Sequence, residues 1–213
     1  MPSGGTVIVF GAGAVGLLCA AVAMVKGASK VVIADIDAGR LDFAVKNGFA
    51  HGSYTVPMKR GKDIDENLAI AKETATAVTE IDGVGEVDVV FECTGVPSCV
   101  QAGIYATRPG GRLMLVGMGT PVMTIPLSAA ALREVDIVGV FRYANTYQES
   151  IEIVQQGMKS GPDFSKLVTH RFVGLDQAPK AFEMAGKTKD ADGELVLKVV
   201  IDSSDDASNS AKL

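Results

Sequence analysis

The sequence has no tryptophan, only two histidines and only three cysteines among its 213 residues. The cysteines, Cys19, Cys93 and Cys99, are odd in number and scattered, which argues against a disulfide framework and favours a reducing compartment. No cysteine pair has the C-x₂₋₄-C spacing of a structural zinc site. We interpret His170, which lies in an apolar strand pattern, as a structural residue and His51, which lies in a turn, as a surface residue.

The chain also lacks an excess of positive charge. Its formal net charge is −5, and the sequence contains no long Lys/Arg cluster. Both features argue against binding to nucleic acid. The N-terminal run is uncharged up to Lys26 and is long enough to span a membrane. No basic residue precedes this run, as a signal peptide would require, and its pattern changes from strand-like to helix-like at a glycine-rich turn. We therefore predict no membrane segment.

Glycine and apolar residues are abundant instead, with 24 glycines and 47% hydrophobic residues, as in a soluble α/β domain with many tight turns. Strand-like and helix-like patterns alternate along the chain. The expected strands are 6–10, 30–35, 51–55, 86–92, 112–117 and 136–141. The expected helices are 15–26, 38–47, 63–79 and one that follows Pro97. Six strands with crossover helices predict a doubly wound parallel Rossmann sheet.

The pattern loosens after Tyr143. An amphipathic helix is expected around residues 147–158, and another helix near 179–186. Two further strands are expected at 167–172 and 194–201, and the polar segment 203–213 is expected to be a disordered tail.

The first strand leads directly into a G-x-G-x-x-G motif formed by Gly11, Gly13 and Gly16. Gly11 allows a tight turn, Gly13 lets the backbone approach a pyrophosphate, and Gly16 lets the helix pack closely on the strand. The helix N-terminus then offers N–H groups and a positive dipole end to phosphates. The glycines, together with Val15 in the first helical turn, are therefore candidate dinucleotide-binding residues.

Asp35 ends the second strand, 19 positions after Gly16. A carboxylate there can accept hydrogen bonds from both adenosine ribose hydroxyls and would repel a 2′-phosphate, so it favours NAD over NADP. The alternative is that Asp35 only caps the helix that follows. Arg40 lies about one turn further on and is a candidate neighbour of the adenine, with a solvated helix residue as the alternative.

Ligands of a doubly wound sheet lie beyond the carboxyl ends of its strands. The ends of the later strands are residues 92–96, 116–119 and 140–147. We expect Gly95, Gly117 and Gly119 to let the cofactor come close, and Arg142 and Tyr143 to supply a charge and a hydroxyl.

Four segments carry a family resemblance: VIVFGAGAVG (7–16), DVVFECTGVPSCVQ (88–101), RPGGRLMLVGMG (108–119) and ALREVDIVGVFRYANTY (131–147). They closely resemble zinc-dependent medium-chain polyol dehydrogenases, most of all the sorbitol, xylitol and L-arabinitol dehydrogenases of fungal type. FRYANTY and LVTHRF are specific to the polyol branch, and the resemblance extends to about Ile201. It implies NAD-linked oxidation of a sugar alcohol to a ketose, and it leaves the particular sugar alcohol open.

The resemblance also implies residues that border the cofactor: Thr94, Gly95, Val116, Phe141, Arg142 and Tyr143. Backbone groups of Val116 and Phe141 would hold the carboxamide. Arg142 and Tyr143 would lie beside the nicotinamide and the substrate hydroxyls, which makes them candidate substrate-side residues.

In this family the catalytic zinc is held by Cys, His and Glu ligands in a domain that precedes the glycine motif, whereas only ten residues precede Gly11 here. We therefore expect this chain to lack the zinc ligands and to be inactive alone. The expected domains are an NAD-binding domain, 1–144, and a segment, 145–202, that would complete the absent catalytic domain. The strands at 167–172 and 194–201 would then lack partners and expose apolar surface.

Several alternatives remain open from the sequence. The chain could be a non-catalytic NAD-binding module that senses redox state or dimerises with a full-length relative. A homo-oligomer could form through an edge strand at Thr124–Ser128. Metal-free chemistry of the short-chain type is disfavoured because no tyrosine has a lysine four positions later.

The cytoplasm is the expected location, with the peroxisome as an alternative because Ala211-Lys212-Leu213 resembles the S-K-L signal.

Overall fold

A computed structural model describes residues 3–203, with no description of the side chains of 158–160. The chain divides into two compact units, residues 1–163 and 164–213. The first unit therefore reaches beyond the boundary expected at 144/145 and includes helix α6, Tyr147–Ser160. The Lys26 ammonium lies 2.6 Å from the Glu149 carboxylate and joins this helix to the end of α1, Ala14–Val25.

The first unit contains a six-stranded sheet in the order β3-β2-β1-β4-β5-β6, with every neighbouring pair parallel. The strands are β1 Thr6–Phe10, β2 Lys30–Asp35, β3 Gly52–Thr55, β4 Val87–Glu92, β5 Thr107–Leu115 and β6 Asp136–Gly139. The strand order reverses between β1 and β4, so the carboxyl ends of these two strands flank a topological switch point. The predicted doubly wound Rossmann sheet is confirmed.

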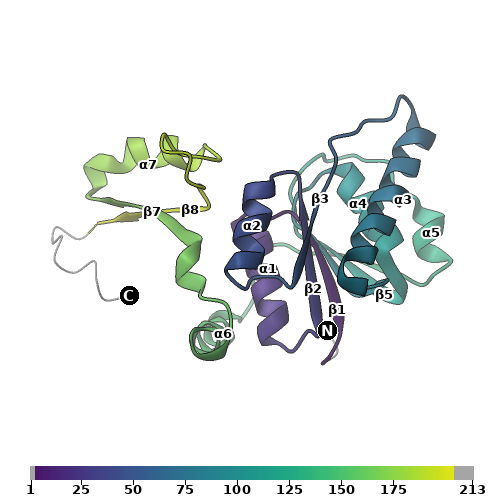
Figure 1. Cartoon of the computed structure of the whole chain (residues 1–213), viewed down its shortest axis with the longest axis horizontal. Helices are drawn as coiled ribbons and strands as arrows, with labels where there is room; N and C mark the ends of the chain where they lie inside the picture. The colour runs from purple at the N-terminus through teal and green to yellow at the C-terminus, as the bar shows by residue number, and fades with distance from the viewer. Residues whose placement is uncertain (1–2, 204–213) are drawn as a thin grey trace. The chain divides into compact units, whose positions relative to one another are not determined.

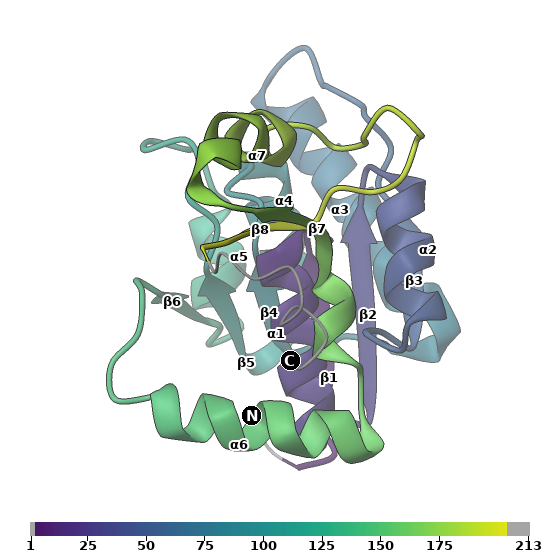
Figure 2. The ribbon, with the colours of Figure 1, turned by 90° about the vertical axis from the view of Figure 1, so that its left-hand side faces the viewer.

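Helices cover both faces of this sheet, as Figure 1 shows. On one face lie α1 and α2, Ala38–Lys46, and on the other lie α3, Ile64–Glu80, and α4, Pro97–Ala106, followed by the short α5, Leu127–Ala131. A short 3₁₀ helix, η1, spans Ile81–Gly83. Figures 1 and 2 both place α6 beside the end of α1.

The central strands are buried on both faces, as a parallel sheet between two helix layers requires. Val7, Ile8 and Val9 of β1 and Val31, Val32 and Ile33 of β2 have no exposed surface. Their β-branched side chains suit a pleated, buried strand. This rigid centre fixes the positions of the turns that follow β1 and β2.

The helix starts follow the chemistry of the sequence. Asp63 caps α3 by accepting a hydrogen bond from the Glu66 N–H at 2.9 Å, as its spacing to Glu66 predicted, and α4 begins at Pro97. The turn expected at 109–112 is not a strand boundary. β5 already begins at Thr107, and its pairing with β4 shifts from Val87↔Thr107 to Val89↔Arg112, so an irregularity inside the strand absorbs the two glycines.

The second unit contains β7, Val168–Val173, paired in parallel with β8, Lys198–Asp202. Between them lie η3, Leu175–Gln177, and α7, Ala178–Ala185, and η2, Phe164–Leu167, precedes β7. The strand expected from 194 begins only at Lys198, because the preceding segment pairs with the chain at 188–189. The two strands partner each other, which corrects the expectation that they lack partners, although Leu175 and Phe182 are exposed.

Three further expectations have three different outcomes. Thr124–Ser128 is not a strand: α5 begins at Leu127, and β6 and β3 form the edges of the large sheet. The expected C-terminal tail and its Ala211-Lys212-Leu213 ending fall at 204–213, outside the described residues. Among the residues that are described, no helix is long and apolar enough to cross a membrane.

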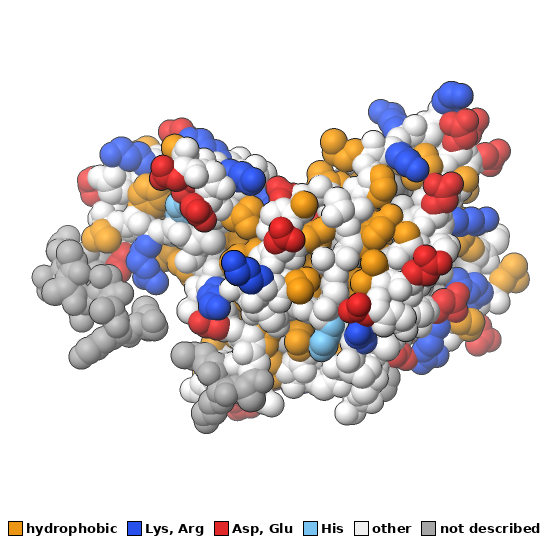
Figure 3. All heavy atoms as spheres, viewed as in Figure 1, with side chains coloured by type: hydrophobic (Ala, Val, Ile, Leu, Met, Phe, Trp, Pro, Cys, Tyr) orange, Lys and Arg blue, Asp and Glu red, His pale blue; other side chains and the backbone are white. Residues whose placement is uncertain are grey.

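Acidic and basic side chains are intermixed over the molecular face in Figure 3.

Candidate functional site

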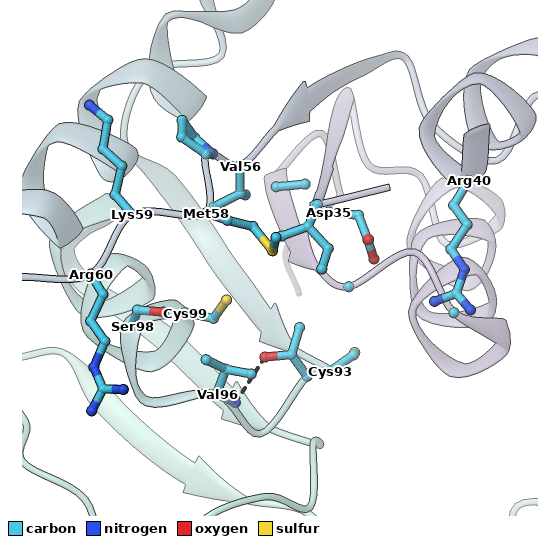
Figure 4. A pocket seen from close by; sticks show the side chains of 16 residues that line it. Asp35, Arg40, Val56, Met58, Lys59, Arg60, Cys93, Val96, Ser98 and Cys99 are labelled. Carbon is cyan, nitrogen blue, oxygen red and sulfur yellow. Dashed lines mark hydrogen bonds between the residues drawn. The ribbon is translucent and has the colours of Figure 1, made fainter. Parts of the chain in front are cut away.

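A cavity of about 570 Å³ lies at the carboxyl ends of the strands in the first unit (Figure 4). Five of the predicted site residues line it: Gly11, Gly13, Asp35, Arg40 and Thr94. They follow β1, β2 and β4, so the switch point of the sheet brings them together as the topology requires.

The turn after β1 depends on the absence of side chains at two of its glycines. Gly11 has a φ of +101°, in the region that glycine adopts without strain. A Cβ on Gly16 would lie 1.8 Å from the Gly11 carbonyl oxygen, whereas a Cβ on Gly13 would meet no protein atom within 4 Å. Gly11 and Gly16 therefore build the turn, while Gly13 leaves open space beside the helix start.

Helix α1 begins without a side-chain cap. Gly13 is its N-cap residue, no side chain accepts a hydrogen bond from its first N–H groups, and its first turn contains no acidic residue. The positive end of the helix dipole is therefore not offset locally, which suits an anionic group at this position.

The Asp35 carboxylate is held at the cavity by backbone donors. One oxygen accepts a hydrogen bond from the Ala12 N–H at 2.6 Å and the other from the Asp37 N–H at 2.9 Å. The alternative role, capping of the next helix, belongs to Asp37, whose side chain accepts from the Arg40 N–H at 3.1 Å. Asp35 is therefore oriented by the glycine turn and is not the helix cap.

The sequence analysis missed the part of the wall that follows β3. Val56, Pro57, Met58, Lys59 and Arg60 all line the cavity. Figure 4 shows Lys59 and Arg60 on the opposite side of the cavity from Arg40, with Asp35 and Met58 between them. The rule that ligands lie at the carboxyl ends of strands could have indicated this loop, had it been applied to β3 as well.

Glu92, at the end of β4, is a second residue that the sequence analysis missed. Its side chain is only 1% exposed, yet it carries a carboxylate. That carboxylate accepts hydrogen bonds from the Thr94 N–H at 2.8 Å, the Gly95 N–H at 3.0 Å and the Thr94 hydroxyl. The Thr94 hydroxyl oxygen in turn accepts from the Val96 N–H at 3.0 Å (Figure 4). Glu92 thus fixes the loop that places Thr94 in the cavity wall.

Gly95, Gly117 and Gly119 lie where the loops after β4 and β5 meet. A Cβ on Gly95 would lie 2.4 Å from the Gly119 nitrogen, and a Cβ on Gly117 would lie 2.1 Å from the Gly95 nitrogen. Their small size lets the loops after β4 and β5 pack backbone against backbone. The Val116 and Gly117 N–H groups both donate to the Glu92 carbonyl oxygen, at 2.9 and 2.7 Å. None of these four residues, the three glycines and Val116, lines the cavity.

The predicted residues after β6 lie outside the cavity. Phe141 is 76% exposed and Tyr143 is 64% exposed. The Arg142 guanidinium lies 5.2 Å from the centre of the Phe141 ring, and Tyr143 meets Tyr147 edge-on with the two hydroxyls 3.2 Å apart. Val15 is likewise exposed, and Gly16 is buried beneath the glycine turn.

The two histidines have local partners. His51 Nδ1 accepts a hydrogen bond from the Val31 N–H at 3.0 Å, and His170 Nε2 lies 3.1 Å from an Asp190 carboxylate oxygen. The hydrogen bond with His170 lowers the pKa of Asp190. In the described part of the chain, no group of three or more His, Cys, Asp or Glu residues could hold a metal ion.

A parallel sheet of this strand order, with a glycine turn and an acidic residue at the end of β2, defines the dinucleotide-binding Rossmann class. The zinc-binding dehydrogenase family matches residues 14–156 of the chain. The chain belongs to this family.

Known proteins support the same assignment. Sorbitol dehydrogenase from Mus musculus is 41% identical over 184 residues, which is 86% of this chain and 47% of that protein. Sorbitol dehydrogenase from Homo sapiens is also 41% identical, over 84% of this chain and 46% of that protein. A solved oxidoreductase/dehydrogenase of unknown specificity from Escherichia coli is 28% identical with a TM-score of 0.73, over 95% of this chain and 52% of that one. The chain thus spans about half the length of the curated relatives it matches.

Proposed function

We propose that this chain is the NAD-binding part of a zinc-dependent polyol dehydrogenase, which oxidises a sugar alcohol to a ketose. Family membership and the likeness to sorbitol dehydrogenases support the reaction class. The sugar alcohol is of the sorbitol, xylitol or L-arabinitol type, as the polyol-branch segments FRYANTY and LVTHRF imply.

The observation that carries the proposal is the carboxylate of Asp35. Two backbone N–H groups hold it at the cavity, so its remaining acceptor capacity is available to the two ribose hydroxyls of the adenosine. A phosphate on the 2′-hydroxyl would meet this negative charge at close range, which is the physical basis for a preference for NAD.

Other residues of the cavity have matching roles in the proposal. The uncapped start of α1 and the open space at Gly13 would take the pyrophosphate. Arg40 would border the adenosine. Its buried Nε has no hydrogen-bond partner among the described residues, so a bound ligand could accept a hydrogen bond from it. When bound, NAD supplies the acceptor for the hydride.

The nicotinamide side of the proposal rests on the family resemblance alone. Val116, Gly117 and Phe141 would contact the nicotinamide, and Arg142 and Tyr143 would lie on the substrate side. This chain's own contribution is to bind and orient the dinucleotide.

Calorimetric titration of the purified chain with NAD and NADP tests the proposal. The substitution Asp35→Ala should weaken NAD binding about tenfold or more, since a hydrogen bond to a charged group contributes about 1.5–3 kcal/mol. It should weaken NADP binding much less. Asp42→Ala is the matched control, because Asp42 is an exposed acidic residue of α2, the helix that follows Asp35. Equal losses for the two cofactors would remove Asp35 from the ribose site.

A second measurement separates the enzyme part from a non-catalytic module. The 213-residue chain should bind NAD but should not reduce it with sorbitol or xylitol. A turnover rate typical of enzymes, on the order of 10 s⁻¹, would contradict this expectation. Co-purification with a longer relative would favour the module that dimerises.

A further inference from the structure

Two cysteine thiols meet beneath the dinucleotide cavity. The sulfur of Cys93, in the loop after β4, lies 3.9 Å from the sulfur of Cys19, in the second turn of α1. The two residues are 74 positions apart in the sequence, so the fold alone brings them together. A disulfide has an S–S distance of about 2.05 Å, so a bond requires the two sulfurs to approach by about 2 Å.

The thiol pair can be reached from two sides. Cys93 lines the proposed dinucleotide cavity. Cys19 lines a different hollow, of about 520 Å³, beside α1, together with Leu18 and Val22 of that helix and Phe91 of β4. A small oxidant could therefore reach Cys19 without passing through the cavity.

The hydrogen bond between the two thiols makes them chemically unequal. Cys93 donates this bond, which lowers the pKa of the Cys19 thiol, although burial opposes the shift. The same bond, together with burial, raises the pKa of Cys93. Burial raises the pKa of the third cysteine, Cys99, to about 11. Cys19 is therefore the thiol that most readily provides the thiolate, which is the reactive form of cysteine.

We infer that Cys19 and Cys93 form a reversible disulfide that lowers the affinity of the cavity for its dinucleotide. The oxidant is a peroxide. The Cys19 thiolate attacks a peroxide oxygen, the O–O bond breaks, and Cys19 becomes a sulfenic acid with release of hydroxide. The Cys93 sulfur then attacks the Cys19 sulfur and expels its oxygen as water. In total, two thiols and one hydrogen peroxide give one disulfide and two waters.

The bond would act on the cavity through the glycine turn. It would join α1 directly to the residue that precedes Thr94 in the cavity wall. The turn is closely packed against α1, because the Gly16 backbone lies against the Gly11 carbonyl oxygen. A shift of α1 would therefore be transmitted to the turn. A small movement of the helix would therefore displace the turn and the N–H groups at the helix start. By reciprocity, bound dinucleotide would oppose formation of the disulfide.

Peptide mapping tests the disulfide directly. Trypsin places Cys19 in peptide 1–26 but both other cysteines in peptide 73–112, because Pro109 blocks cleavage after Arg108, so the Cys99→Ser variant is the appropriate background. After treatment with hydrogen peroxide and alkylation, non-reducing mass spectrometry should find peptide 1–26 linked to peptide 73–112 within one chain. Dithiothreitol should release the two peptides. In the unsubstituted chain, fragmentation of the linked peptide should locate the bond at Cys93.

NAD titration of the same samples tests the consequence. Oxidised Cys99→Ser should bind NAD about fivefold or more weakly than the reduced form, and reduction should restore the affinity. Cys19→Ala and Cys93→Ala, each combined with Cys99→Ser, should show no peroxide effect that dithiothreitol reverses.

The outcomes separate this inference from the proposed function on which its NAD readout rests. Sulfinic or sulfonic products, links between different chains, or a bond that joins Cys93 to Cys99 would overturn the disulfide, even where reduced protein binds NAD. A correct disulfide with unchanged NAD affinity would overturn its effect on the cavity. Reduced protein that binds no NAD would contradict the proposed function, while the peptide map would still decide the disulfide.

Discussion

The two sides of the proposed dinucleotide site differ in how their residues are held. On the β1–β2 side, Gly11 and Asp35 are fixed by the turn and by backbone hydrogen bonds. On the β6 side, Phe141, Arg142 and Tyr143 are exposed and contact one another or Tyr147, close by in the chain. The sheet and its first helix therefore suffice to build one side of the site, whereas the other side is not shaped by packing within the first unit.

The sharpest test of the rigid side uses its glycines. Gly16→Ala should destabilise the chain by about 3 kcal/mol, because the new Cβ would lie 1.8 Å from the Gly11 carbonyl oxygen and forces the turn apart. Gly13→Ala should change stability by less than about 1 kcal/mol, since its Cβ meets no atom within 4 Å. Urea denaturation measures both variants.

The same pair separates folding from binding. Gly13→Ala should still weaken NAD binding about tenfold, or about 1.4 kcal/mol, because its Cβ would occupy the space proposed for the pyrophosphate. If the Gly16→Ala variant had unchanged stability, the turn would be able to relax, and the β1–β2 side would then be less rigid than the structure indicates.

The next largest effect is expected at Glu92. Glu92→Gln should cost about 2 kcal/mol of stability, because a neutral amide accepts these hydrogen bonds more weakly than the buried carboxylate. The amide NH₂ would also face the Gly95 N–H at the position where Oε2 now accepts from it. Glu86→Gln is the control: its carboxylate pairs with Arg133 at 2.8 Å but is 51% exposed, so its loss should cost less than about 1 kcal/mol. Thermal and urea unfolding of the two variants should differ accordingly, and similar losses would mean that the Glu92 network is not a determinant of the loop.

Local sequence signals predicted the rigid side well. The bounds of β1 and β2 and the roles of Gly11 and Gly16 follow from a β-branched run, a glycine turn and a helix pattern within about 30 residues. The register of these elements also places Asp35 next to the turn, because parallel strands present their carboxyl ends at one edge.

The misses involve contacts that connect distant parts of the chain. The burial of Glu92 and the packing of Gly95 against Gly119 depend on two loops meeting in space, which a linear pattern does not encode. The wall at 56–60 was missed because the rule that ligands lie at the carboxyl ends of strands was not applied to β3. The proximity of Cys19 and Cys93 could likewise not be predicted, since two cysteines far apart in the sequence give no indication that they lie close in the fold.

The smallest effect is expected on the β6 side. Tyr143→Ala should change the stability of the chain by less than about 0.5 kcal/mol, because the side chain is 64% exposed and loses only its contact with the exposed Tyr147. It should also change NAD affinity less than about twofold, which is about 0.4 kcal/mol, since Tyr143 lies outside the cavity. Calorimetric titration beside Asp35→Ala provides the comparison under one set of conditions. If both substitutions weakened NAD binding equally, the β6 side would have to order around the cofactor, and the contrast between the two sides would be a property of the unliganded chain alone.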